Sequence, residues 1–290
     1  MVLSTQTHYA AKTFGLPKAI DMIADAGFDA LDLSMFYEQQ IAWIFEDGYK
    51  EPLNRALQRA KNRGLFFNQA HAPFPTLKEN DPEYNKINLP RVIRAIEAAG
   101  AVGAKNVIVH PVAYSEAQTE RNVEMYTSLA PVARENGVKI AIENMWGRDP
   151  RRGVICKNVC SDAEGLLELF HLLPSDCFTV CLDLGHIGLV GDYEAPTIRA
   201  LGADALTCVH VHDNDYKHDA HTAPFLMDLP WKEIANAFAD IGYRGDITLE
   251  ADDFLRPLPP TLYAAGLSFM HAAGRELIRM IGEAERSADE

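Results

Sequence analysis

The stretch Phe178-Thr-Val-Cys-Leu-Asp-Leu-Gly-His186 joins an apolar run, typical of a buried strand, to an acid, a glycine and a histidine. A buried strand that closes on Asp-x-x-His places two metal-capable side chains at its carboxyl end. Three other apolar runs also close on a carboxylate or an imidazole, namely Ile140-Ala-Ile-Glu143, Cys208-Val-His210 and Ile247-Thr-Leu-Glu250. Four strands are therefore predicted to direct candidate ligands toward one place.

Short β-rich runs alternate with amphipathic segments along the chain, and many of the amphipathic segments end at a glycine, which is typical of repeated βα units. The eight predicted strands are Val2–Thr7, Ala30–Ser34, Leu65–His71, Ala104–His110, Val138–Glu143, the opening stretch, Leu206–His212 and Gly245–Glu250. The predicted helices are Pro17–Ala26, Leu53–Arg63, Leu89–Ala99, Arg121–Glu135, a segment from the Ser161 capping box to before Pro174, Thr197–Leu201, Trp231–Asp240 and Leu262–Gly282.

This alternation predicts an α/β fold, a single (β/α)8 TIM barrel formed by residues 1–290, with function at the carboxyl ends of the strands. An open doubly wound sheet is the alternative. The chain has no Gly-x-Gly-x-x-Gly turn after its first strand and no phosphate-binding Gly-Lys-Ser/Thr loop, and both absences favour the barrel.

Composition limits the partners of the protein. The net charge of −14 argues against non-specific binding to nucleic acid or to an anionic membrane, because both gain affinity from Lys and Arg. No apolar run approaches the roughly 20 residues that span a bilayer. The amino terminus lacks the features of a secretory signal, so a cytoplasmic location is expected. The five cysteines form no Cys-x-x-Cys pair, and reduced thiols are the simpler interpretation.

The loop after the second predicted strand is rich in aromatic side chains. It carries Phe36, Tyr37, Trp43, Phe45 and Tyr49. Such a loop is predicted to roof a pocket, and its exposed aromatics also allow a homo-oligomer interface.

Most of the histidines fall at or just beyond the carboxyl ends of predicted strands. They are His8, His71, His110, His186, His210, His212, His218 and His221, and the other two lie on predicted helices. A single such histidine is as often a hydrogen-bonded core residue as a ligand. Many imidazoles and carboxylates at one barrel mouth are costly to desolvate unless cations compensate the charge.

The strongest candidate metal ligands are Glu143, Asp183, His210 and Glu250, which end four consecutive predicted strands. Three carboxylates and one imidazole form an oxygen-rich site for a divalent metal ion, suited to Mn²⁺, Mg²⁺ or Co²⁺ and also able to take Zn²⁺. No Lys or Arg ends any of these strands. This weakens the interpretation as buried ion pairs and counts against a Schiff-base enzyme.

Several motifs carry a family resemblance that extends over nearly the whole chain. They are Ala70-His-Ala-Pro73, Val109-His-Pro111, Ile142-Glu-Asn144, Leu182-Asp-Leu-Gly-His186, Val209-His-Val-His-Asp213, Asp219-Ala-His221 and Thr248-Leu-Glu250. In this order and spacing they resemble the xylose isomerase-like barrel superfamily of sugar isomerases and epimerases. Relatives of that superfamily include the metal-dependent apurinic endonucleases.

The resemblance implies a metal-dependent isomerase or epimerase that acts on a keto sugar or a related polyol. A divalent cation on the four ligands would bind the substrate carbonyl and stabilise an enediolate. Glu143 and Glu250 would be the catalytic pair, one as base and the other as acid. His186 would contact the substrate or orient a carboxylate, and Trp146 would pack on the sugar ring or within the fold.

A second interpretation is a zinc-dependent apurinic/apyrimidinic endonuclease. The resemblance then implies additional metal ligands at His71, His110, His186, Asp219 and His221. In sugar isomerase-like proteins the same residues would bind substrate hydroxyls or a second cation. The chain departs from the endonuclease pattern after His210, where it reads Val-His-Asp-Asn-Asp, and before His186, where it has Leu-Gly in place of Thr-Cys.

With the acidic charge added, the sequence favours the isomerase, a carbohydrate substrate, and no nucleic acid or membrane partner. A non-catalytic sugar- or metal-binding barrel is the third and weakest interpretation, because Glu143 and Glu250 are both present.

Overall fold

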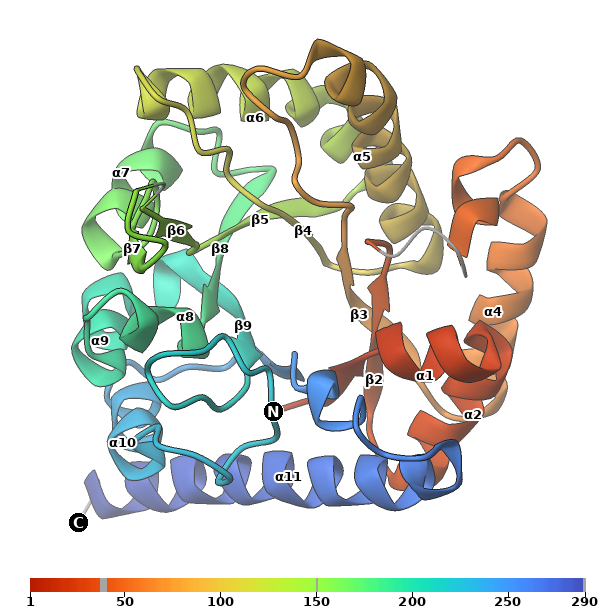
Figure 1. Ribbon diagram of the computed structural model, residues 1–290. Coiled ribbons are helices and arrows are strands. Elements are labelled where there is room, and N and C mark those ends of the chain that lie inside the picture. The colour runs from red at the N-terminus through yellow and green to blue at the C-terminus, as the bar shows by residue number, and fades with distance from the viewer. Residues whose placement is uncertain (37–40, 150, 289–290) are drawn as a thin grey trace.

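The computed structural model describes residues 1–36, 41–149 and 151–288. Within these residues, eight parallel strands close into a barrel in the order β1-β10-β9-β8-β5-β4-β3-β2 (Figure 1). The barrel strands are β1 (Leu3–Gln6), β2 (Ala30–Ser34), β3 (Phe66–His71), β4 (Asn106–Val109), β5 (Lys139–Glu143), β8 (Phe178–Asp183), β9 (Leu206–Val211) and β10 (Asp246–Leu249). Because β1 pairs with both β2 and β10, the sheet has no edge, which excludes the doubly wound alternative.

Helices surround the ring of strands in Figure 1. They are α1 (His8–Phe14), α2 (Leu16–Ala26), α4 (Lys50–Asn62), α5 (Pro82–Val102), α6 (Gln118–Asn136), α7 (Ala163–His171), α8 (Leu184–Leu189), α9 (Glu194–Ala205), α10 (Trp231–Asp240) and α11 (Tyr263–Ala288). Short 3-10 turns lie at η1 (Ala42–Phe45), η2 (Asp252–Phe254) and η3 (Pro260–Leu262). The predicted TIM barrel is confirmed.

The strict alternation of one helix per strand is wrong in detail. Helices α1 and α8 follow β1 and β8 almost directly, and an antiparallel hairpin of β6 (Trp146–Arg148) and β7 (Ile155–Lys157) follows β5. These elements have three to seven residues, too few to show a helical or strand period in the sequence. They nevertheless matter, because they build the mouth of the barrel.

The predicted capping box is also wrong by one residue. The N-cap of α7 is Asp162, whose carboxylate accepts the Gly165 N–H at 3.0 Å. The hydroxyl of Ser161 instead accepts the Asn158 N–H at 2.6 Å and donates to the Met145 carbonyl at 2.5 Å. Ser161 therefore holds the loop that closes the β6–β7 hairpin onto the end of β5.

A small apolar layer inside the barrel positions the functional side chains. It consists of Ile108, Ala141, Cys181 and Cys208, one residue each from β4, β5, β8 and β9. Side chains two positions apart on a strand share a face. The residues two positions further on are His110, Glu143, Asp183 and His210, so all four face the interior just beyond the apolar layer.

All five cysteines are free in the structure, and four of them are buried. No helix among the described residues is both long enough and apolar enough to cross a membrane.

Candidate metal centre at the barrel mouth

Four buried side chains at the carboxyl ends of β5, β8, β9 and β10 form what we call the carboxylate-rich group, namely Glu143, Asp183, His210 and Glu250. Nδ1 of His210 lies 2.7 Å from Oε1 of Glu143 and 2.5 Å from Oε2 of Glu250. One candidate ligand atom from each residue lies within 4.8 Å of all the others. The structure thus brings together the four side chains that the sequence selects as metal ligands.

The oxygens of this group fit a divalent cation. Oδ1 of Asp183 accepts the His186 backbone N–H at 2.8 Å, whereas Oδ2, also buried, has no hydrogen-bond partner among the described residues. An unpaired buried carboxylate oxygen is costly unless a cation meets it. No Lys or Arg in the described part of the chain pairs with these carboxylates, whose ion pairs there are all with histidines.

A buried chain of side chains supports His210 from the opposite side. Nε2 of Gln69 lies 2.7 Å from Nε2 of His210 and donates to Oδ2 of Asp32, also at 2.7 Å. Such contacts to the second ring nitrogen set the orientation of a ligating imidazole. Sequence reasoning missed both residues, although Gln69 shares a strand face with His71 two positions further on.

His71 and His110 extend the site on the β3–β4 side and, with Glu143, form what we call the His71 group. Nε2 of His110 lies 2.8 Å from Oε2 of Glu143 and 3.1 Å from Nε2 of His71. The ring of Phe36 packs edge-on against His71, and the ring of Phe74 stacks on His110. Glu143 is therefore shared between two groups of candidate ligands.

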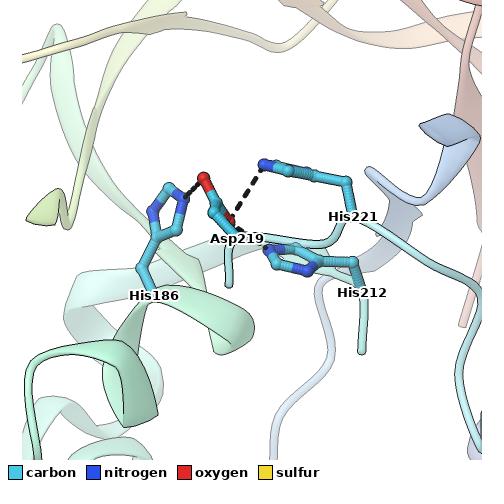
Figure 2. Close-up of side chains that lie close together, drawn as sticks. All are labelled: His186, His212, Asp219 and His221. Carbon is cyan, nitrogen blue, oxygen red and sulfur yellow. Dashed lines mark ion pairs between the residues drawn. The ribbon is translucent and has the colours of Figure 1, made fainter. Parts of the chain in front are cut away.

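On the opposite side, four side chains form what we call the imidazole-rich group, namely His186, His212, Asp219 and His221 (Figure 2). The imidazoles converge on the Asp219 carboxylate, with Nε2 of His186 at 3.5 Å from Oδ2 and Nε2 of His221 at 3.2 Å from Oδ1. The sequence placed three of these residues among its candidate ligands and missed His212 in that role.

Backbone carbonyls fix the tautomer of several of these imidazoles. Nδ1–H of His186 donates to the Asn144 carbonyl at 2.8 Å, that of His221 to the Glu250 carbonyl at 2.9 Å, and that of His71 to the Ala72 carbonyl at 2.8 Å. Because a carbonyl only accepts, the proton lies on Nδ1, and Nε2 faces the mouth. Nε2 is then the nitrogen available to a cation or substrate.

The electrostatics of the site follow from burial among opposite charges. Burial alone lowers the pKa of His210 and raises that of Glu143, but the Glu250 and Glu143 carboxylates reverse the effect on His210, and the His210 and His110 imidazoles reverse the effect on Glu143. The pKa of His210 therefore lies well above its ordinary value, and that of Glu143 lies well below. Burial also lowers the pKa of His186, but the Asp183 and Asp219 carboxylates outweigh it and raise that pKa to about 10. Protons thus supply the positive charge that bound cations would supply instead.

The loop after β9 carries Asp219 and His221, and Asp213 holds it in place. The Asp213 carboxylate accepts backbone N–H groups of Met227 at 2.8 Å and Leu229 at 3.1 Å. His221 has a positive φ of 39°, a conformation that non-glycine residues rarely adopt and that is often found at functional sites. The loop is therefore shaped to present its two candidate ligands.

Two cavities open beside these groups, with Trp146 in the wall of both. One has a volume of about 410 Å³ and includes Phe74 and His110 in its lining, and the other, of about 700 Å³, includes Asp219 and Lys217. The Trp146 indole N–H donates to Oδ2 of Asp219 at 3.0 Å. Trp146 thus orients a candidate ligand and also lines the space beside it.

The predicted aromatic roof is realised only in part. Phe36 lies at the mouth against His8 and His71. Tyr49 turns away from the mouth, and its hydroxyl donates to Glu97 on α5 at 3.3 Å. Tyr37 lies outside the described residues.

The structure is thus a closed parallel barrel with buried carboxylates and imidazoles, a candidate metal centre, at the carboxyl ends of its strands. Residues 20–273 match the family described as xylose isomerase-like TIM barrel, and the chain belongs to that family. This agrees with the resemblance drawn from the motifs.

Two relatives represent the similar curated sequences. The Uncharacterized protein y4fM of Sinorhizobium fredii is 26% identical over 280 residues, covering 84% of this chain and 83% of that protein. A probable endonuclease 4 of Staphylococcus epidermidis is 25% identical over 174 residues, covering 56% of this chain and 57% of the endonuclease.

Solved structures show the same fold. A D-tagatose 3-epimerase-like protein has a TM-score of 0.74 and 19% identity, covering 98% of this chain and 99% of its own. The IolI protein with a bound zinc atom has a TM-score of 0.72 and 15% identity, with the same coverage of 98% and 99%. At these identities the likeness establishes the barrel and leaves the reaction to the site itself.

Proposed function

We propose that this protein is a divalent-metal-dependent isomerase or epimerase that moves a proton on a keto sugar or a sugar-like polyol. The observation that carries the proposal is the pair of buried carboxylates, Glu143 and Glu250, that approach the same ring nitrogen of His210 at 2.7 and 2.5 Å. Two carboxylates that lie beside the same candidate metal position can each reach one substrate carbon, from different directions. A carbon next to a carbonyl loses its proton readily, so this pair can remove a proton from it and return one.

The chain supplies the base and the acid of the proposed step. One carboxylate takes the proton from the carbon beside the carbonyl, the C–H electron pair forms a C=C bond, and the C=O pair moves onto oxygen. The other carboxylate, carrying a proton taken up from solvent, returns it to the same carbon from the opposite face while the oxygen pair re-forms the C=O bond, which gives an epimer. In an isomerisation the proton goes instead to the former carbonyl carbon, and the proton of the neighbouring hydroxyl passes to the former carbonyl oxygen as the new C=O bond forms. The pKa of Glu143, held well below its ordinary value by His210 and His110 against the effect of burial, keeps this carboxylate ionised.

The same residues account for the dependence on a metal. Glu143, Asp183, His210 and Glu250 would hold the ion, and Gln6 Nε2 donates at 2.5 Å to the remaining oxygen of Glu250. A divalent cation bound there supplies positive charge that offsets the negative charge developing on the substrate oxygens. Oδ2 of Asp183, buried without a hydrogen bond, supports this assignment.

The substrate would enter from the cavity of about 410 Å³ that touches His110 and Trp146, a size typical of small-molecule sites. His71 and His110 would bind its hydroxyls, as imidazoles both donate and accept hydrogen bonds. The sugar 3-epimerases among the structural neighbours act on substrates of this class, which supports the choice.

Deuterium exchange tests the proposal whichever product the protein forms. The metal-loaded protein is incubated in D₂O with ketohexoses, ketopentoses and cyclic polyol ketones, and carbon-bound deuterium is followed by NMR. We expect exchange at a carbon next to the carbonyl of at least one ketone, and its loss in Glu143→Gln. Absence of exchange in every ketone, with metal loading verified, overturns the proposal.

A zinc-dependent phosphodiesterase is the second candidate, because Glu143 belongs to two ligand groups and a third group lies nearby. Several neighbouring cations can activate water and hold a phosphodiester. The endonuclease 4 relatives support this candidate, although they match only about half of the chain. Metal-dependent nicking of an abasic duplex, absent in Glu143→Gln, would establish it in place of proton transfer.

A further inference from the structure

We infer that the imidazole-rich group binds a second cation and that His212 is its fourth protein ligand, beside His186, Asp219 and His221. This site would take zinc in particular. The inference concerns the imidazole-rich group and does not depend on which reaction the carboxylate-rich group performs.

The spacing of the four side chains agrees with tetrahedral coordination. In a tetrahedral zinc site with bonds of about 2.0–2.1 Å, ligand atoms lie about 3.3–3.4 Å apart. Nε2 of His221 and Nε2 of His212 lie 3.2 and 3.8 Å from Oδ1 of Asp219, and Nε2 of His186 lies 3.5 Å from Oδ2 of the same carboxylate. All four candidate ligand atoms lie within 4.8 Å of one another. Figure 2 shows the four side chains gathered around this carboxylate.

One carboxylate oxygen within the group has no hydrogen bond that would explain its position without an ion. Oδ1 of Asp219 is buried and has no hydrogen-bond partner among the described residues, although His221 and His212 both approach it. Oδ2 of Asp219 accepts the Trp146 indole N–H, which fixes the carboxylate plane. The unpaired oxygen therefore points to the space between the two imidazoles.

His212 itself presents the correct nitrogen. Its Nδ1 lies 3.4 Å from the Asp213 carbonyl, whereas its Nε2 faces two carboxylates, at 3.0 Å from Oδ1 of Asp183 and 3.8 Å from Oδ1 of Asp219. Its ring stacks on that of His221, with centroids 4.1 Å apart and an angle of 21° between the planes, so one of the two rings turns about its Cβ–Cγ bond when both Nε2 atoms bind the same ion. Because two carboxylates lie near Nε2 of His212, a positive charge beside this nitrogen stabilises the group.

Gly185 makes room for this ring. A Cβ atom added at position 185 would lie 1.9 Å from Cε1 and 2.3 Å from Nε2 of His212, far closer than any side chain tolerates. Only glycine therefore permits the imidazole to lie against α8, between Asp183 and Asp219. The positions of Gly185 and His212 depend on each other.

Four protein ligands leave a tetrahedral ion without an open position. Such an ion binds no substrate, and its role is to tie the loop after β9, through Asp219 and His221, to α8, through His186. Three imidazoles and one carboxylate favour zinc over the harder cations.

Metal binding to His212→Asn tests the inference, with His218→Asn as a matched control on the same loop, since His218 is exposed and pairs with Asp215. Zinc stoichiometry is measured by equilibrium dialysis and elemental mass spectrometry, and coordination by the visible spectrum of the Co²⁺-loaded protein. We expect His212→Asn to weaken one zinc site about 10- to 100-fold and to remove a tetrahedral Co²⁺ signal. His218→Asn should leave both unchanged. Equal zinc binding and an unaltered spectrum in His212→Asn overturn the inference.

The wild-type protein gives a decision even if a variant fails to fold. In zinc-soaked crystals, we expect an anomalous peak within bonding distance of Nε2 of His212 and of the other three ligands. A peak held by His186, Asp219 and His221 alone, or no peak in this group, contradicts the inference.

Discussion

The carboxylate-rich and imidazole-rich groups lie side by side at the barrel mouth yet differ in chemistry and in support. The first offers three carboxylates and one imidazole from the ends of four strands of the closed barrel. The second offers three imidazoles and one carboxylate, and Asp219 and His221 belong to a loop. Oxygen ligands on rigid strands suit hard, exchangeable cations, whereas imidazoles suit zinc. This difference agrees with the two proposals, in which the first group performs the chemistry and the second anchors a loop.

The two groups also differ in what holds their imidazole rings in place. The Gln69 side chain, which donates to Asp32, contacts the far nitrogen of His210, whereas backbone carbonyls hold the far nitrogens of His186 and His221. A substitution can therefore alter the support of the first group, but the support of the second group is largely part of the fold.

The largest expected effect is on turnover when a carboxylate of the first group becomes an amide. Glu143→Gln or Glu250→Gln should lower the rate of substrate deuterium exchange by at least about 10³-fold, because an amide cannot take up the proton. Circular dichroism should show an unchanged fold. Glu120→Gln, at an exposed position in the first turn of α6, is the matched control. Wild-type rates in either variant would remove the two-carboxylate mechanism.

Removal of the ions should lower the stability of the whole barrel. A cation that binds only the folded chain, present at 100–1,000 times its Kd, contributes about 3–4 kcal/mol to the free energy of unfolding. Chelation should therefore lower Tm by several degrees, and readdition of zinc should restore it. If verified removal leaves the melting curve unchanged, neither group contributes to stability through an ion.

Gly185→Ala should affect the second group and spare the first. The added methyl group would displace the His212 ring, at a cost of about 1–3 kcal/mol in the free energy of unfolding. Gly282→Ala is the control, since a Cβ there meets only Arg286, at 3.7 Å. Chemical denaturation should show this decrease in the free energy of unfolding for Gly185→Ala. Adding the same Gly185→Ala change to His212→Asn should lower the free energy of unfolding much less. Equal losses in the single and double variants would mean that the ring is not the obstacle.

Gln69→Leu should weaken metal binding at the first group alone. The change removes the contact to Nε2 of His210 at nearly constant volume, and loss of such support typically costs 10- to 100-fold in metal affinity. Calorimetric titration with Mn²⁺ measures this effect. The tetrahedral Co²⁺ signal of the second group should persist, and its loss would show that the two groups are not independent.

The last prediction concerns Glu194, a buried acid at the start of α9. Burial raises the pKa of Glu194 from 4.5 to about 7, so the folded chain binds this proton more tightly than the unfolded chain does. Stability should therefore fall as pH rises between about 4.5 and 7, by about 1–3 kcal/mol, and this loss should be absent in Glu194→Gln. Urea denaturation of both proteins across this range isolates the difference. Parallel curves would show that Glu194 has an ordinary pKa.

The barrel could be predicted from the sequence because its strands are apolar runs whose last residues carry the chemistry. The same pattern found Glu143, Asp183, His210 and Glu250, since each ends a run. It missed His212, because this residue lies two positions after His210 and is therefore expected on the same strand face, with no separate role. The contact between His212 and Gly185 exists only in the folded structure and has no signal in the sequence. It missed Asp32 and Gln69 because they lie within their strands and act through another side chain.

The short elements escaped for a different reason. The six residues of α8 and the three-residue strands of the β6–β7 hairpin carry no period, and their positions depend on tertiary contacts such as the Asp183 cap. Trp146 lies on that hairpin, so its orientation toward Asp219 could not be predicted without first predicting the hairpin.

The most direct test of the distinction between the two groups is the metal content per chain, measured by elemental mass spectrometry. The protein is purified without added metals and measured before and after dialysis against a weak chelator with excess Mn²⁺. The account predicts one zinc per chain that survives the dialysis and a second ion that exchanges for manganese. Three zinc ions retained together would contradict it, because the three ligand groups would then act as one cluster.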